Sequence, residues 1–221
     1  MQTRRLCARA SNPQQRTRRG PASRLFVPLV FCSVFLCGCA NAPREHFYAL
    51  TPVAQAPETG PPAVADERHV SIGPVSIPEI VDRPQLVVRH GANQVEILEQ
   101  HRWAQSLATD IAGVLAANLA TLLPHLAVTT NTSPASAGAD TRVGVEIVQF
   151  DAIPGEAVTV QARWSVRAAR AVKEKPAGAT LREPVRGPGP DALAAAFDRA
   201  LARLSAEIAD DLESASIFSG R

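Results

Sequence analysis

Apolar residues recur at steps of three and four in two long segments, which is the spacing of an amphipathic helix. In the first segment these residues are Trp103, Leu107, Ile111, Val114, Leu115, Leu119 and Leu122. In the second they are Leu193, Phe197, Leu201, Leu204, Ile208 and Leu212. Pro124 is expected to stop the first helix, and Pro190-Asp191 is expected to start the second.

Other segments alternate between apolar and polar residues, which predicts strands with one buried face. Residues 156–167 alternate cleanly, and we expect them to pair with 142–150 across the turn Asp151–Gly155. Residues 86–89 and 95–98 predict a second hairpin. Shorter strands are expected at 46–50 (an edge strand), 70–72, 75–77, 126–130 and 180–185, with turns at 78–84 and 173–178. The pattern predicts a two-layer α+β fold, with an antiparallel or mixed sheet and two amphipathic helices packed on one face.

The N-terminus has the composition of an export signal. Arginines precede an apolar run, LFVPLVFCSVFL at 25–36, which is shorter than the ~20 residues needed to span a bilayer. The run ends in Leu36-Cys37-Gly38-Cys39, which resembles a lipobox. That resemblance implies cleavage before Cys39 and attachment of diacylglycerol and an acyl chain to its thiol, with no other cofactor. A plain secretory signal cut near Gly38 or Ala40, or a short buried helix, is the alternative.

These features divide the chain into three parts. Residues 1–38 form the expected lipoprotein signal peptide. Residues 39–68 form a lipidated N-terminus with a short strand and a linker containing four prolines, and residues 69–215 form the folded domain. We expect the stretch 51–68 to be a flexible tether.

The charge and the cysteine content exclude several kinds of partner and site. The leader contains seven arginines and no acid, so the remainder has 16 basic and 21 acidic side chains. This excess of acid argues against a nucleic-acid partner. The four cysteines are Cys7, Cys32, Cys37 and Cys39, so the domain after the leader can have no internal disulfide and no thiolate metal site.

No catalytic motif is found in the sequence, and no histidine pair has a zinc-binding spacing. His101 with Glu99 is interpreted as a surface hydrogen bond. Asp82 and Arg83 are candidates for partner binding, the alternative being a salt bridge that orders the turn. Arg102 and Trp103 are also candidates, because Arg and Trp are enriched at interface hot spots. In the alternative, Trp103 starts the core stripe and Arg102 pairs with Glu99.

Several motifs together resemble the ABC-type transport auxiliary lipoprotein family, the PqiC-like outer-membrane lipoproteins. They are HFYAL soon after the lipobox, Ile77-Pro78 with Asp82-Arg83-Pro84-Gln85, and Arg102-Trp103-Ala104, expected to open a helix. The likeness continues through VGVEIVQFDA and VTVQARWSV to the last helix. The long N-terminal region and the proline-rich stretch at 52–68 depart from the family pattern.

The resemblance implies a non-enzymatic role at the periplasmic face of the outer membrane. The partners would be an inner-membrane MCE-domain protein that spans the periplasm and its associated permease, in a system for lipid transport and envelope integrity. A homo-oligomer is compatible with that role. The alternatives are another structural or assembly lipoprotein of the envelope, or an envelope hydrolase, for which no nucleophile or metal site can be named.

Overall fold

The computed structural model describes residues 43–55, 68–168 and 175–219, and every structural statement below concerns these residues. The strands are β1 (His46–Tyr48), β2 (His69–Ser76), β3 (Gln85–Gly91), β4 (Gln94–Trp103), β5 (Ala127–Thr130), β6 (Thr141–Ile153), β7 (Ala157–Ala168) and β8 (Lys175–Pro184). The helices are α2 (Leu107–Leu122), the short 3₁₀ helix η3 (Pro134–Gly138) and α3 (Gly189–Ser219). From Arg44 onward the chain forms one compact unit.

The predicted α+β class is confirmed. The described strands form two mixed sheets, however, where the sequence pattern predicted one. One sheet has the order β1-β4-β3 and the other has the order β5-β2-β6-β7-β8. Both predicted hairpins are confirmed, as the antiparallel pairs β3–β4 and β6–β7. The strand expected at 46–50 lies at the edge of the smaller sheet, where it pairs in parallel with β4.

Two local predictions about strands are corrected. Residues 70–77 do not form two strands, because β2 continues through Gly73-Pro74 with a shift of register against β6. Residues 175–178 of the expected turn 173–178 belong to strand β8, which begins at Lys175. Strand β7 is long enough to pair with β8 from the start, since Val166 is paired with Lys175. Residues 173 and 174 lie outside the described part of the chain.

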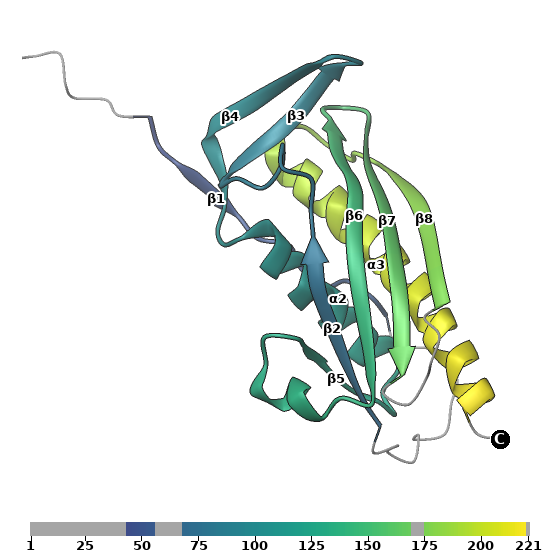
Figure 1. Cartoon of the computed structure of the whole chain (residues 1–221). Helices are drawn as coiled ribbons and strands as arrows, with labels where there is room; N and C mark the ends of the chain where they lie inside the picture. Colours follow the sequence, from purple (N-terminus) through teal and green to yellow (C-terminus); the bar gives the residue numbers. More distant parts are fainter. Residues whose placement is uncertain (1–42, 56–67, 169–174, 220–221) are drawn as a thin grey trace, which may run out of the picture. The chain divides into compact units, whose positions relative to one another are not determined.

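Both helices pack on the same face of the larger sheet, as predicted (Figure 1). Helix α2 lies over β2 and β5, α3 lies over β7 and β8, and the two helices contact each other. All six members of the apolar stripe of α3 are buried. The inward side chains of β7 are buried beneath the helices: Val158, Val160, Ala162, Trp164 and Val166.

An aromatic cluster joins the two sheets. Trp103, the last residue of β4, makes edge contacts with Phe150 of β6 and Phe197 of α3, each at a centroid distance of 6.4 Å. The rings of Phe150 and Phe197 are stacked 3.8 Å apart. The cluster fixes the end of β4 against the main core, and thereby positions the turn 78–84, which is bonded to the end of β4.

Candidate functional site

The residues predicted to bind a partner come together where the turn 78–84 meets the end of β4. Gln85 and Arg102 are paired in the sheet, and the backbone N–H of Trp103 donates to the carbonyl of Pro84 at 2.7 Å. Asp82 and Arg83 immediately precede this contact in the chain. The fold therefore makes one region from two motifs about 20 residues apart in the sequence.

The turn itself is held by backbone hydrogen bonds. The N–H groups of Val81 and Asp82 donate to the carbonyl of Pro78, at 3.0 and 3.2 Å. Asp82 is exposed and Arg83 is half-buried. Within the described residues neither side chain forms a hydrogen bond or an ion pair, so the expected salt bridge between them does not order the turn.

Arg102 and Trp103 have different roles from each other. Arg102 is half-buried and pairs with Glu45, Nη2 to Oε1 at 2.9 Å, rather than with Glu99. Trp103 is buried in the aromatic cluster and cannot be an exposed anchor. The prediction that Arg102-Trp103-Ala104 opens a helix is wrong, because α2 begins at Leu107. The backbone N–H groups of Trp103 and Ala104 bond instead to Pro84 and Tyr48 across the sheet.

Strand β1 adds a polar aromatic surface beside Arg102. The hydroxyl of Tyr48 and Nδ1 of His101 are joined by a hydrogen bond of 2.8 Å, and the rings of His46 and His101 are stacked at 5.3 Å. Burial, together with the charge of Asp191, raises the pKa of Tyr48. The expected pairing of His101 with Glu99 is not formed, since Glu99 instead accepts from Gln85.

Buried polar side chains on the two helices hold the segment that follows β1, which we call the strap (Ala49–Gln55). The N–H of Leu50 donates to Asp110 Oδ2 at 2.9 Å, that of Thr51 to Asp198 Oδ1 at 2.8 Å, and that of Ala54 to Asn118 Oδ1 at 3.0 Å. The predicted flexible tether therefore does not begin at Thr51. Residues 56–67 of that prediction lie outside the described residues.

Sequence reasoning did not find the strap contacts, although a signal was present. Asp110, Asn118 and Asp198 each lie next to an apolar residue of a predicted helix stripe, and all three are buried. A buried polar group requires a hydrogen-bond partner. Burial raises the pKa of Asp198 to about 6, against the opposing effect of the Thr51 hydrogen bond and with a further increase from nearby Asp110.

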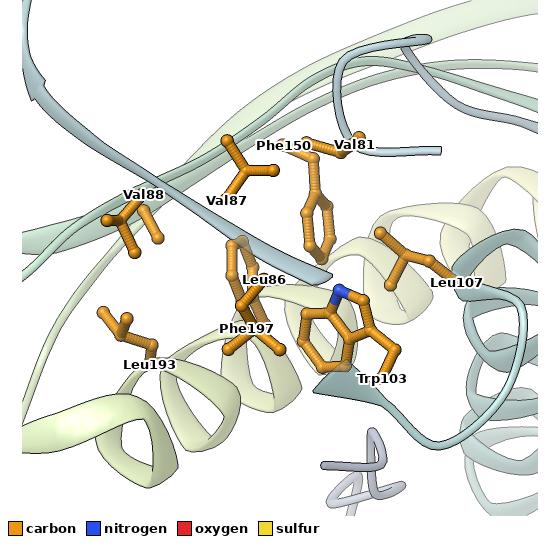
Figure 2. A pocket seen from close by; sticks show the side chains of 10 residues that line it. Val81, Leu86, Val87, Val88, Trp103, Leu107, Phe150, Leu193 and Phe197 are labelled. Atoms are coloured by element: carbon orange, nitrogen blue, oxygen red, sulfur yellow. The ribbon is translucent and has the colours of Figure 1, made fainter. Parts of the chain in front are cut away.

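The cavity lined by the aromatic cluster is too small to hold a lipid chain (Figure 2). Trp103, Phe150 and Phe197 lie around it together with aliphatic side chains from β3, and its volume is about 10 Å³. That is roughly the space of one water-sized probe. An open groove of about 270 Å³ lies beside the turn 78–84, where Ile80 and the Arg89–Asp151 ion pair line it.

Neither a metal centre nor a membrane-spanning helix is found in the part of the chain that the structure describes. No three His, Cys, Asp or Glu side chains are grouped there as metal ligands would be. None of the helices described is both long enough and apolar enough to cross a bilayer.

The fold of this chain is similar to the folds of two proteins with known crystal structures. One is an uncharacterised protein, with a TM-score of 0.64 and 19% identity over 77% of this chain and 99% of the other. The second is a Xanthomonas campestris protein of the DUF330 family, with a TM-score of 0.65 and 18% identity over 80% of this chain and 100% of the other. No curated protein sequence matches significantly.

The family model for the ABC-type transport auxiliary lipoprotein component matches residues 48–209, and the chain belongs to this family. The predicted resemblance is thereby confirmed. The family is defined as an auxiliary lipoprotein component of transport systems, which is not a class of enzyme.

Proposed function

We propose that this protein is a lipid-anchored lipoprotein on the periplasmic face of the outer membrane, which docks a periplasm-spanning MCE-domain protein and its ABC-type permease for lipid transport. Membership of the auxiliary lipoprotein family supports the transport role. The lipobox-like Leu36-Cys37-Gly38-Cys39 supports the anchor, which would be diacylglycerol and an acyl chain on Cys39.

One observation supports the location of the docking surface. Asp82 and Arg83 are consecutive residues on a turn fixed by its backbone, and neither side chain is paired among the described residues. Unpaired groups held by a rigid turn can bond to a partner with little loss of conformational entropy. Ile80, exposed on the same turn, and the half-buried Arg102 would complete the surface.

Trp103 contributes to docking only indirectly, because it is buried. Its indole packs on the rings that hold β4 in place, and β4 in turn pairs with the start of β3 at Gln85. Substitution of Trp103 therefore tests the stability of the site and not a contact with the partner.

A co-purification experiment tests this proposal. The double variant Asp82→Ala and Arg83→Ala is expected to capture at least tenfold less MCE-domain protein from detergent-solubilised envelopes, which corresponds to about 1.4 kcal/mol. The matched control is Arg163→Ala with Asp210→Ala, which removes one exposed base and one exposed acid elsewhere. Full capture by the double variant would contradict the docking surface, and no capture by the wild-type protein would contradict the role.

A further inference from the structure

Phe47 is the most exposed large apolar side chain among the described residues, at 62%. It lies in β1, and Arg44 lies three residues before it. Arg44 is exposed and forms no ion pair within the described part of the chain. An exposed aromatic ring and an exposed cation on the same short segment, the cation unpaired among the described residues, are a combination suited to the interface of a bilayer with anionic headgroups.

The segment that carries Phe47 is fixed to the folded domain on both sides of the ring. His46, Phe47 and Tyr48 pair with His101, Arg102 and Trp103 of β4. On the N-terminal side Glu45 is bound to Arg102, and on the C-terminal side the strap is bound to buried Asp110, Asp198 and Asn118. The position at which the N-terminal chain reaches the domain is therefore determined by the fold.

The chain between the proposed lipid and this position is short. Cys39 and Arg44 are five residues apart, which fully extended span at most about 18 Å. One headgroup layer is about 5–7 Å deep, so the start of β1 can lie no more than about 13 Å beyond the headgroups. An acylated Cys39 would thus hold the start of β1 close to the membrane surface.

The strap leads away from β1 along the first helix. Leu50 is bound at Asp110 and Ala54 is bound at Asn118, and eight residues of α helix span about 12 Å. The strap follows α2 from the helix start toward its C-terminal half, so β1 lies at one end of the fixed segment. Val53, the other exposed large apolar residue of this segment, lies toward the opposite end.

We propose that the β1 end of the smaller sheet rests on the bilayer, with the ring of Phe47 at headgroup depth and Arg44, three residues earlier in the chain, at the membrane surface. This inference rests on the proposed lipidation of Cys39. The occupant of this surface is the membrane that holds the anchor.

Depth-dependent fluorescence quenching tests the orientation. The mature lipidated protein would be reconstituted as Phe47→Trp and, separately, as Val53→Trp. The vesicles would contain phosphatidylethanolamine, phosphatidylglycerol and a phosphatidylcholine brominated on its acyl chains. The native Trp103 and Trp164 are buried and contribute the same background to both variants. Phe47→Trp is expected to be quenched several-fold more strongly than Val53→Trp, with emission shifted to shorter wavelength.

The outcomes separate this inference from the proposed function. If mass spectrometry finds Cys39 acylated but the two variants are quenched equally, the orientation is wrong while the anchor stands. If Cys39 carries no lipid, both the anchor and the orientation are overturned. Strong quenching of Phe47→Trp alone, in protein shown to be acylated, supports the bilayer contact.

Discussion

At the scale of single residues, Gly73 occupies a position that a side chain would disturb. Its φ is 112°, a conformation that residues with a Cβ rarely adopt, and a Cβ at this position would lie 2.5 Å from Oδ1 of Asn131. Gly113 is helical and lies on the surface of α2, where a Cβ would meet nothing within 4 Å. Gly113 therefore serves as the control position for a substitution at Gly73.

We expect Gly73→Ala to lower the free energy of unfolding by about 1–3 kcal/mol, because it combines an unfavourable φ with a steric clash. Gly113→Ala should instead raise it by about 0.5–1 kcal/mol, since Ala favours the helix. Urea unfolding followed by circular dichroism measures both. Equal effects of the two changes would contradict the described environment of Gly73.

The carboxyl of Asp198 makes stability depend on pH. Burial raises its pKa from the ordinary 3.8 to about 6, so the folded state binds the proton more tightly than the unfolded state does. Its contribution to stability is therefore complete below about pH 4 and is lost as the pH rises through about 6. This difference in pKa between the folded and unfolded states changes the free energy of unfolding by at most about 3 kcal/mol.

Asp198→Asn should remove this dependence, because the amide oxygen can still accept from Thr51 but carries no charge. We expect the variant to be more stable than the wild type at pH 8 and similar to it at pH 4. Thermal unfolding at both pH values measures the change, and Asp210→Asn, which alters an exposed carboxylate, is the control. A variant that is less stable at pH 8 would show that the charge of Asp198 is needed.

At the scale of elements, the strap is bound to the helices rather than paired with a sheet. Its N–H groups at Leu50, Thr51 and Ala54 all donate to side chains of α2 or α3. Asp110 also accepts from Gln105 at 2.6 Å, so its two oxygens are both used. Loss of such an acceptor leaves a buried donor without a partner, which costs about 1–3 kcal/mol.

Asp110→Ala is thus expected to increase hydrogen exchange at the Leu50 amide by at least tenfold, while the amides of β7 keep their protection. Asp110→Asn retains an acceptor at the same place, so it should increase hydrogen exchange at the Leu50 amide much less. Exchange measured by NMR distinguishes the two variants. Unchanged protection of Leu50 in Asp110→Ala would mean that β1 alone holds the strap.

At the scale of the whole domain, the described residues are held together by apolar burial and hydrogen bonds. All four cysteines lie at or before residue 39, so no disulfide can form within the described part. The core runs from the inward face of β7 to the stripes of both helices, and the aromatic cluster extends it to the smaller sheet.

We therefore expect the melting temperature of the mature protein to be the same with and without a reducing agent. Removal of a native disulfide from a small secreted domain commonly costs about 2–5 kcal/mol, which would shift the transition by several degrees. Differential scanning calorimetry in the presence and absence of dithiothreitol makes the comparison. A lower temperature under reducing conditions would contradict stabilisation by the core alone.

The sequence by itself determined the elements whose pattern is periodic. The two helices, the two hairpins and the α+β class follow from spacing along the chain, because periodicity reports which face of an element is buried. It also determined the family, through motifs that lie in the turn 78–84 and at the end of β4.

Only the tertiary structure decided how distant segments share backbone partners. Trp103 matches the helical spacing of α2, yet it ends a strand because its N–H is bonded to Pro84, 19 residues earlier. The prolines of 51–68 predict a flexible tether, because they exclude regular structure, whereas the start of this stretch is held by side chains of the helices, 60 to 147 residues away in the sequence. Local pattern records burial, but it does not record which remote side chain satisfies a given N–H group.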